Sequence, residues 1–255
     1  MSNKHDIKDT GRDFCFPGKK LRRQVGNAIA DFDMIRAGDR ILLGLSGGKD
    51  SLSLLHILLY LQTVAPVKFE VAAITVDPMS DSFDPSPLKS YVKSLNVPYY
   101  YESQPIMDLG KEHMEGDSYC SWCARMKRGI MYSTARRENY NVIALAQHLD
   151  DLAESFLMSA FHSGQLRSMK AHYTIDEGDL RVIRPLAYVR ETQTRAFADE
   201  ADLPVIMENC PACFSMPTQR QHMKSLLLEE EKHNKGLYSS ILTAIKPLIA
   251  KNNAK

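Results

Sequence analysis

Residues 46–51 read SGGKDS, a combination of residue types that suits the binding of a phosphate chain. The opening serine and the two glycines carry little or no side chain, so their backbone N–H groups can close on phosphate oxygens. Lys49 adds a positive charge, and Ser51 adds a hydroxyl group. The segment therefore predicts an anion site for the phosphates of a nucleotide. The alternative is a glycine turn that binds nothing.

The Walker A phosphate loop, G-x-x-x-x-G-K-[ST], does not fit this segment. Its first glycine would fall on Leu43, and Lys49 is followed by Asp50 rather than by a hydroxyl residue. A carboxylate at this place suits a loop that holds pyrophosphate and its metal ion during adenylation. We therefore interpret Lys49 and Asp50 as catalytic residues of a reaction that splits ATP to release pyrophosphate.

The flanking segments predict that this loop joins a strand to a helix. The apolar run Arg40–Leu45 predicts a buried strand, and Ser51–Gln62 predicts a helix. The alternation continues, with strands expected at Phe69–Val76, Pro98–Glu102, Val142–Ala146 and Val182–Ile183, and helices at Pro87–Leu95, Arg125–Arg137, Asp151–Phe161 and Glu191–Ala201. This order predicts an α/β fold: a parallel twisted sheet with helices on both faces.

Polar residues follow several of these strands, and ligands of such sheets lie at the carboxyl ends of the strands. The glycine loop, Asp77 and the cluster of His148, Asp150 and Asp151 each come directly after a strand, so we expect them to converge. Two adjacent carboxylates favour magnesium and nucleotide contacts, although Asp150 alone is also a good helix cap. His148 is either an acid/base group or a structural, hydrogen-bonded histidine.

Four of the five cysteines form two CxxC pairs, Cys120–Cys123 and Cys210–Cys213. Paired thiols in an intracellular chain indicate a metal, a cluster or redox chemistry. A thioredoxin-like pair would follow a first strand at a helix start, and that order is absent here. The spacing favours a zinc site and an iron–sulfur cluster equally.

The composition is that of a globular enzyme. The chain has 255 residues, 44% of them hydrophobic and 25% charged, with a formal net charge of +1. It has no apolar run long enough to span a membrane and no signal-peptide pattern, so we expect a cytoplasmic location. Two basic clusters favour a polyanionic partner, although each alone could be a solvated face.

The motifs quoted above resemble those of the N-type ATP pyrophosphatase (PP-loop) superfamily and, more narrowly, those of the tRNA-cytidine(32) 2-sulfurtransferase family. The resemblance rests on SGGKDS, on the first CxxC with its following R-x-K-R-G, on H-x-D-D at 148–151 and on RPL at 184–186. It extends from about residue 20 to about residue 228 and includes CPAC-x-x-x-P-x-Q-R-Q near the end.

This resemblance implies an ATP-dependent thiolation of tRNA. ATP and Mg²⁺ would adenylate the C2 carbonyl oxygen of a cytidine, pyrophosphate would leave, and sulfur would then replace the oxygen as AMP departs. It further implies a [4Fe–4S] cluster that three cysteines hold, a sulfur source such as a cysteine desulfurase, and a homodimer. By position the cluster ligands are Cys120, Cys123 and Cys213, with Cys210 as the alternative third ligand.

The resemblance and the spacing together give the following expected site residues. ATP is expected to contact Gly44, Ser46, Gly47, Gly48, Lys49, Asp50, Ser51, Asp77, His148 and Asp151; magnesium is expected at Asp50 and Asp150; and RNA is expected at Lys20, Arg22, Arg23, Arg125, Lys127 and Arg128.

The chain departs from the family pattern at two places. Gln147 and Leu149 replace a histidine and a basic residue, and the segment Met169–Leu180 carries acidic residues where the family tends to be basic. Because basic groups supply most non-specific RNA affinity, the target could be another tRNA position or a small molecule. An amidating PP-loop ligase and a zinc-bearing RNA-binding module are the other two alternatives.

The chain divides by sequence pattern into three parts. Residues 1–36 predict a polar tail and an amphipathic helix over Lys20–Ile35. Residues 37–216 predict the ATP-pyrophosphatase domain with both cysteine pairs, and residues 217–255 predict two C-terminal helices, Arg220–Lys232 and Tyr238–Ile249.

Overall fold

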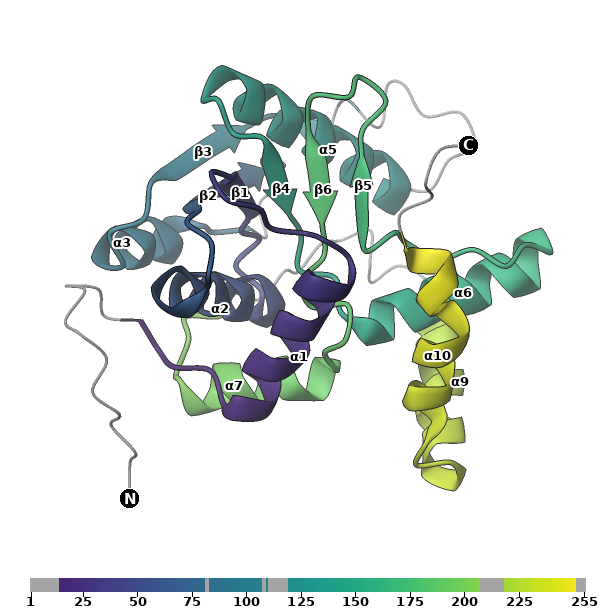
Figure 1. Ribbon diagram of the computed structural model, residues 1–255. Coiled ribbons are helices and arrows are strands. Elements are labelled where there is room, and N and C mark those ends of the chain that lie inside the picture. The colour runs from purple at the N-terminus through teal and green to yellow at the C-terminus, as the bar shows by residue number, and fades with distance from the viewer. Residues whose placement is uncertain (1–13, 81–82, 107–108, 110–118, 207–217, 251–255) are drawn as a thin grey trace.

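The computed structural model describes residues 14–80, 83–106, 109, 119–206 and 218–250 (Figure 1). Its strands are β1 (Arg40–Gly44), β2 (Glu70–Asp77), β3 (Tyr99–Ser103), β4 (Val142–Ala144), β5 (His172–Thr174) and β6 (Arg181–Ile183). Its helices include α1 (Lys19–Asp31), α2 (Lys49–Val64), α3 (Ser86–Ser94), α5 (Tyr119–Arg137), α6 (Leu149–Ser163), α7 (Glu191–Glu200), α9 (Gln219–His233) and α10 (Leu237–Ile249).

The strands form one sheet in the order β3-β2-β1-β4-β6-β5. Every neighbouring pair is parallel except β5 with β6, which is antiparallel. The predicted α/β fold is therefore confirmed, and all five predicted strands are present. One further strand was not predicted: the segment Met169–Leu180 contains the short strand β5, which makes one edge of the parallel sheet antiparallel.

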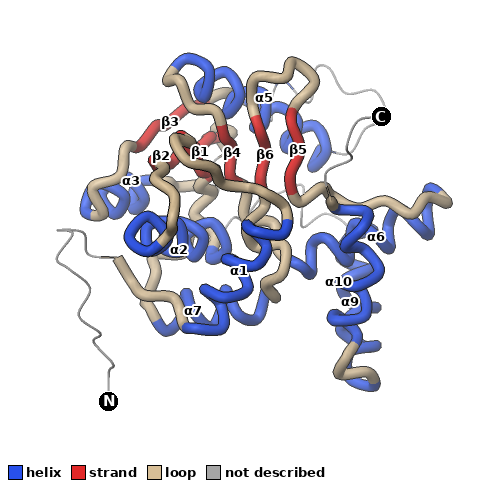
Figure 2. The backbone as a smooth tube through the Cα atoms, in the orientation of Figure 1, coloured by secondary structure: helices blue, strands red, loops and turns tan. Residues whose placement is uncertain are grey.

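The two faces of the sheet bury different sets of residues, because side chains alternate along a strand. Ile41 and Leu43 of β1 pack into a large core that also contains buried residues of α1, α2 and α7. Leu42 points to the opposite face, where Ile130 and Met131 of α5 cover it. Figure 2 shows the strands between these two helical layers.

Helix α2 is buried along its first ten residues or so, which explains why its sequence is apolar all round. Residues from Ser51 to Leu59 are all buried, because the sheet lies on one side and α7 lies against another. Helix α2, which follows the glycine loop, is therefore buried in the interior of the molecule. This burial fixes the position of the loop.

The C-terminal helices pack onto the same core. Leu227 of α9 and Ile245 and Ile249 of α10 are buried in the cluster that includes β1. At the end of α10, the N–H of Ala171 donates to the carbonyl of Ile249 (2.9 Å), and Lys170 Nζ donates to the carbonyls on either side of it. The start of β5 thus binds the end of α10.

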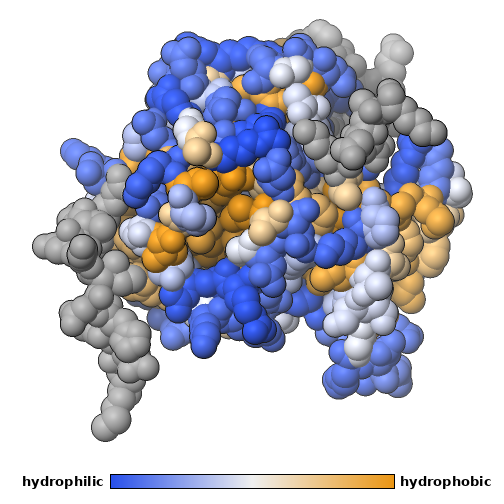
Figure 3. Space-filling model, in the orientation of Figure 1, coloured by the Kyte–Doolittle hydropathy of each residue, from blue (hydrophilic) through white to orange (hydrophobic). Residues whose placement is uncertain are grey.

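On the face shown in Figure 3, apolar side chains gather at the centre of the molecule and again where α6 and α10 lie against each other, and hydrophilic side chains surround them. Within the described residues, no helix has the length and apolar character needed to cross a bilayer.

Candidate active site

The glycine loop joins the end of β1 to the start of α2. Ser51 Oγ donates to the carbonyl of Gly48 (3.0 Å), and the N–H of Gly48 donates to Ser46 Oγ (3.3 Å). Gly47 has φ of +90°, a conformation that L side chains rarely adopt. The N–H of Ile206 donates to the carbonyl of Gly47 (2.9 Å), so the chain that leads toward Cys210 passes directly against the loop.

Replacing Gly47 by alanine should lower stability and abolish ATP binding. A Cβ there would lie 3.1–3.3 Å from three atoms of Ile206. The positive φ would lower the free energy of unfolding by about 1–2 kcal/mol more. Gly38→Ala is the matched control, since Gly38 has φ of +82° and open space around it. Urea unfolding should show a loss for both variants, whereas titration with ATP should show a loss of binding for Gly47→Ala alone. Normal ATP affinity of Gly47→Ala would contradict this role of the loop.

Lys49 lies between two carboxylates. Its Nζ is 2.9 Å from Asp50 Oδ2 and 3.0 Å from Glu191 Oε1, and the lysine side chain is only 17% exposed. The other oxygen of Glu191 is 2.6 Å from Lys224 Nζ. Glu191 is the first residue of α7, which follows β6 along the chain. The predicted phosphate-binding lysine therefore belongs to an ionic cluster, which also contains Arg195, whose Nη2 lies 3.2 Å from Glu191 Oε1.

Glu191 is a residue of this cluster that the sequence analysis did not predict. Burial alone would raise the pKa of its carboxyl, but hydrogen bonds from Lys224 and Lys49 outweigh burial and lower the pKa to about 2. The group is therefore negatively charged at neutral pH. It gives the lysine of the glycine loop an anionic partner within the protein.

Asp50 joins the loop to two other elements. Its Oδ1 accepts a hydrogen bond from Thr194 Oγ1 of α7 (2.5 Å), and its Oδ2 is 3.7 Å from His148 Nε2. The residues predicted to converge from the ends of β1 and β4 thus do lie together. Thr194, a buried neighbour of Asp50, is a second residue that the sequence analysis missed.

His148 and Asp151 cap the start of α6. The N–H of Asp151 donates to His148 Nδ1 (3.3 Å), and the N–H of His148 donates to Asp151 Oδ2 (3.0 Å). This reciprocal pattern is a capping box, which fixes the side chain of His148 toward Asp50. The structural role of His148 is therefore present, while its contact with ATP remains a prediction.

Asp150 faces α7 rather than the glycine loop. Its two oxygens accept hydrogen bonds from Arg190 Nε (3.0 Å) and from the N–H of Glu191 (2.7 Å). Asp150, a residue of α6, therefore caps the first turn of α7. Magnesium binding by Asp150 remains a prediction, and an ion there would have to replace these donors. Within the described residues, no group of three or more His, Cys, Asp or Glu side chains is arranged to hold a metal ion.

Glu154, one turn further along α6, is buried beside this cap. Burial, with help from the charge of Asp151, raises the pKa of its carboxyl to about 7, although Arg220 opposes the shift. The guanidinium of Arg220 lies 3.4 Å from Asp151 and 3.8 Å from Glu154.

Replacing Glu154 by glutamine should stabilise the protein at pH 8. Because the pKa is higher in the folded state than in the unfolded state, wild-type stability falls as the pH rises from about 4.5 to about 7. The variant lacks this loss, so its free energy of unfolding should exceed that of the wild type by about 1–3 kcal/mol at pH 8 and should match it near pH 4. Urea unfolding at both pH values measures the difference. Glu230→Gln, on the exposed side of α9, is the control, and equal stabilities at pH 8 would disprove the shift.

Asp77 ends β2 at the same edge of the sheet as the glycine loop. Tyr101 of β3 donates a short hydrogen bond to its Oδ2, and the N–H of Met79 donates to Oδ1 (2.7 Å). Gly44, at the end of β1, has a packing role as well, because a Cβ there would lie 3.1 Å from the sulfur of Met131. Contacts of Asp77 and Gly44 with ATP remain predictions.

The first cysteine pair lies at the start of α5, which begins six residues before the predicted start. In a parallel α/β sheet a helix that precedes a strand starts at the carboxyl edge, so Cys120 and Cys123 belong to the edge that carries the glycine loop. The two positions are one helical turn apart and share a face. Cys123 is half-buried against the apolar cluster under α5. Cysteine positions one helical turn apart suit thiolate ligation of iron.

The second cysteine pair, Cys210 and Cys213, lies outside the described residues. Of the described residues that flank it, one contacts the glycine loop and the other begins α9. Ile206 binds Gly47, as noted above, and Thr218 caps α9 by accepting a hydrogen bond from the N–H of Gln221 (3.2 Å). The predicted third cluster ligand is therefore drawn from a segment that starts at the glycine loop.

The two predicted RNA-binding clusters lie in different places. Arg125, Lys127 and Arg128 follow Cys123 on α5, and Arg125 is exposed. In the α1 cluster, Lys20 and Arg23 are exposed, whereas Arg22 lies over the ring of Tyr60 and donates to its hydroxyl (2.6 Å). Tyr60 is about 16 Å along α2 from the glycine loop. RNA contact remains a prediction for both clusters.

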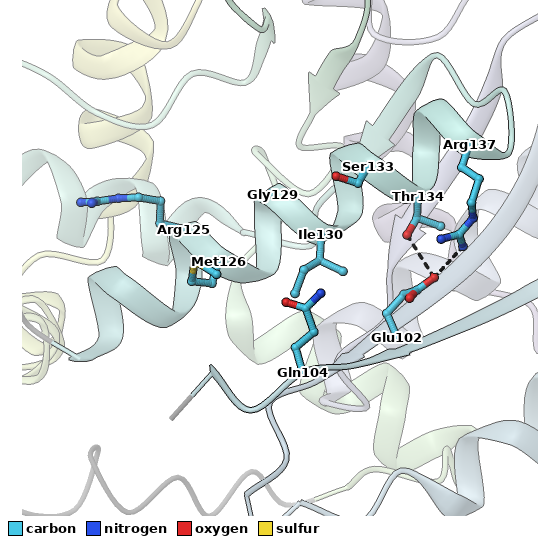
Figure 4. Close-up of a pocket in the computed structure, with 9 residues that line it drawn as sticks. All are labelled: Glu102, Gln104, Arg125, Met126, Gly129, Ile130, Ser133, Thr134 and Arg137. Atoms are coloured by element: carbon cyan, nitrogen blue, oxygen red, sulfur yellow. Dashed lines mark hydrogen bonds and ion pairs between the residues drawn. The ribbon is translucent and has the colours of Figure 1, made fainter. Parts of the chain in front are cut away.

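A pocket of about 330 Å³ lies beside α5, between this helix and the end of β3. Figure 4 shows Glu102 at one end of it, bound to Thr134 and Arg137, and Arg125 at the other end. Its lining combines charged and polar side chains with the apolar Met126 and Ile130, and of the predicted RNA-binding residues it includes Arg125.

Comparison with known proteins decides the family of this chain. Residues 17–214 match the PP-loop domain family. This chain is a PP-loop protein. The match includes the glycine loop, which can now be called the PP-loop, as well as His148, Asp150 and both cysteine pairs.

Proteins similar to it in sequence narrow the family further. A tRNA-cytidine(32) 2-sulfurtransferase from Geobacter sulfurreducens is 42% identical over 228 residues, which cover 89% of each chain. A protein of the same name from Vibrio parahaemolyticus is 38% identical over 245 residues, covering 95% of this chain and 82% of that one. The chain therefore belongs to the tRNA-cytidine(32) 2-sulfurtransferase family, as its motifs predicted.

A solved structure confirms the PP-loop fold. The U34-tRNA thiolase NcsA from Methanococcus maripaludis, determined with its [4Fe–4S] cluster, superposes with a TM-score of 0.71. The alignment covers 93% of this chain and 79% of that one, at 20% sequence identity.

Proposed function

We propose that this protein is an ATP-dependent tRNA sulfurtransferase that converts a cytidine to 2-thiocytidine. The observation that carries the proposal is that the PP-loop and the first cysteine pair occupy the same edge of one sheet, in a chain about 40% identical to tRNA-cytidine(32) 2-sulfurtransferases. In this proposal the PP-loop activates an oxygen atom as a leaving group, and the cysteine pair helps to hold the cluster that binds the sulfur atom.

The PP-loop performs the activation. A carbonyl oxygen of a pyrimidine is a poor leaving group, and transfer of AMP from ATP converts it into a good one. Negative charge develops on the departing pyrophosphate, where the loop N–H groups and the ammonium of Lys49 stabilise it. Asp50 is oriented by Thr194 and holds Lys49 from the other side.

In this proposal a magnesium ion would neutralise part of the negative charge of the ATP phosphates. Asp50 is the carboxylate nearest the loop, and oxygen ligands suit this ion. Asp150 is the second ligand inferred from the sequence, and it would contribute only after releasing Arg190 or the N–H of Glu191.

Three cysteine thiolates hold the cluster in this proposal. We assign Cys120, Cys123 and Cys213 as ligands, with Cys210 as the alternative third ligand. A [4Fe–4S] cluster bound by three cysteines supplies one open iron site at which a sulfur atom can bind. The chain's own contribution is to place two of the cysteine positions one helical turn apart at the start of α5.

The partners follow from the same reaction. The tRNA would lie across the basic residues of α5 and α1, sulfur would come from a cysteine desulfurase or another donor, and two copies of the chain would form a homodimer. We place the enzyme in the cytoplasm, where tRNA is modified. We also retain the division into residues 1–36, 37–216 and 217–255 as a proposal.

Nucleoside analysis tests this function directly. The protein, reconstituted with iron and sulfide under anaerobic conditions, is incubated with unmodified tRNA, ATP, Mg²⁺ and sulfide, and the tRNA is digested for mass spectrometry. The proposal expects 2-thiocytidine that is absent without ATP or without the cluster. Thiolation of a different nucleoside would move the target to another tRNA position, and an absence of any thiolated nucleoside would refute the proposal.

A further inference from the structure

Helix α9 contributes charged groups to the PP-loop cluster. We infer that α9 is part of the ATP site and that its Lys224 is a second cation, beside Lys49, for the phosphates of the nucleotide. This inference rests on the proposed use of ATP, and it adds a residue from a helix that the sequence analysis treated as a C-terminal addition.

One face of α9 carries all the residues that contact the site. Arg220, Lys224, Leu227 and Glu231 recur at helical spacing and therefore lie along one side. Leu227 is buried, and Glu231 forms a bidentate pair with Arg190 at 2.6 and 3.0 Å. These two contacts dock the helix against α6 and α7, so docking does not depend on Lys224.

The position of Lys224 is set by Glu191. Its Nζ is 2.6 Å from one oxygen of that carboxylate, and Lys49 Nζ is 3.0 Å from the other. The two ammonium groups therefore lie no more than about 8 Å apart, because they bind opposite oxygens of one carboxylate. A phosphate chain held by Lys49 thus comes within reach of a flexible lysine side chain that is 36% exposed.

The charges of the cluster favour an exchange of partners. The ionised carboxylate of Glu191 binds both lysines, and its side chain is only 15% exposed. A triphosphate carries more negative charge than one carboxylate, so it can replace Glu191 as the partner of both ammonium groups. Glu191 then acts as the internal partner that orients the two cations before the nucleotide binds.

Binding measurements with three ligands test the inference. The full-length protein is titrated calorimetrically with Mg·ATP, with inorganic pyrophosphate and with adenosine, which lacks phosphate. Lys224→Ala should weaken ATP and pyrophosphate about tenfold and leave adenosine unchanged. Lys224→Met, which keeps the length of the side chain, should lose the same affinity, and Lys224→Arg should restore most of it.

Lys232→Ala is the matched control, because Lys232 lies on the same helix but pairs with Glu229 on the exposed side. It should bind all three ligands like the wild type. An equal loss of adenosine and ATP affinity in the Lys224 variants would overturn the inference, since it would indicate a structural role. ATP affinity unchanged by Lys224→Ala but lost in Lys49→Ala would also overturn it and leave the proposed function intact. Failure of the wild type to bind ATP would instead refute the proposed function.

Discussion

Lys49→Ala should reduce the rate of pyrophosphate release by about 10²–10³-fold, the usual cost of removing one stabilising donor from a developing negative charge. The structure adds a second reason for a large effect. Lys49 also pairs with Asp50, so its loss leaves the Asp50 carboxylate without this ammonium partner beside the incoming phosphates. The measurement is release of labelled pyrophosphate from ATP in the presence of tRNA.

Lys68→Ala is the control for this variant, because Lys68 is exposed in the connection between α2 and β2. It should release pyrophosphate at the wild-type rate. The iron content of Lys49→Ala should also equal that of the wild type, since α5 and its cysteines are separate from α2. Retained turnover of Lys49→Ala would disprove the role assigned to the PP-loop lysine.

Cys213→Ala should prevent assembly of the cluster, whereas Cys210→Ala should leave it intact. Three thiolates hold a [4Fe–4S] cluster in the proposed enzyme, and removal of one leaves a second iron without a protein ligand. Iron and sulfide per chain, together with the broad visible absorbance of the reconstituted protein, report on assembly. We expect near-complete loss of both signals for Cys213→Ala and for Cys123→Ala.

Cys15→Ala supplies the comparison, since this cysteine packs near the carbonyl of Ala201 and belongs to neither CxxC pair. Its cluster content should be normal. The reverse pattern, with Cys210 required and Cys213 dispensable, would exchange the two ligands and leave the mechanism unchanged. Stoichiometric zinc and no iron after reconstitution would rule out the cluster itself.

The sequence predicted those parts of the site whose chemistry is local. SGGKDS carries its own turn, charge and hydroxyl within six residues, and Asp77 and His148 each follow an apolar run that forms a strand. The rule that strand ends converge was sufficient to group them. The same rule could have added Glu191, which opens a helix soon after the last parallel strand.

Other features depend on contacts between distant residues. Thr194 meets Asp50 across 144 positions, and Lys224 meets Glu191 because α9 packs against α6. Strand β5 was missed because its three residues, His172 to Thr174, form no apolar run. Helix α5 starts before its predicted start because the residues around the first cysteine pair carry no amphipathic pattern.

The contact between the start of β5 and the end of α10 has a consequence for the nascent chain. Lys170 binds the carbonyl of Leu248, 78 positions later. At ordinary rates of synthesis the ribosome needs roughly 4–16 s to add that many residues. During this interval the outermost strand of the sheet is present without the helix end that binds beside it, and unpaired strand edges are sites of aggregation. The contact between residues 170–171 and α10 therefore forms only after the end of α10 has been synthesised.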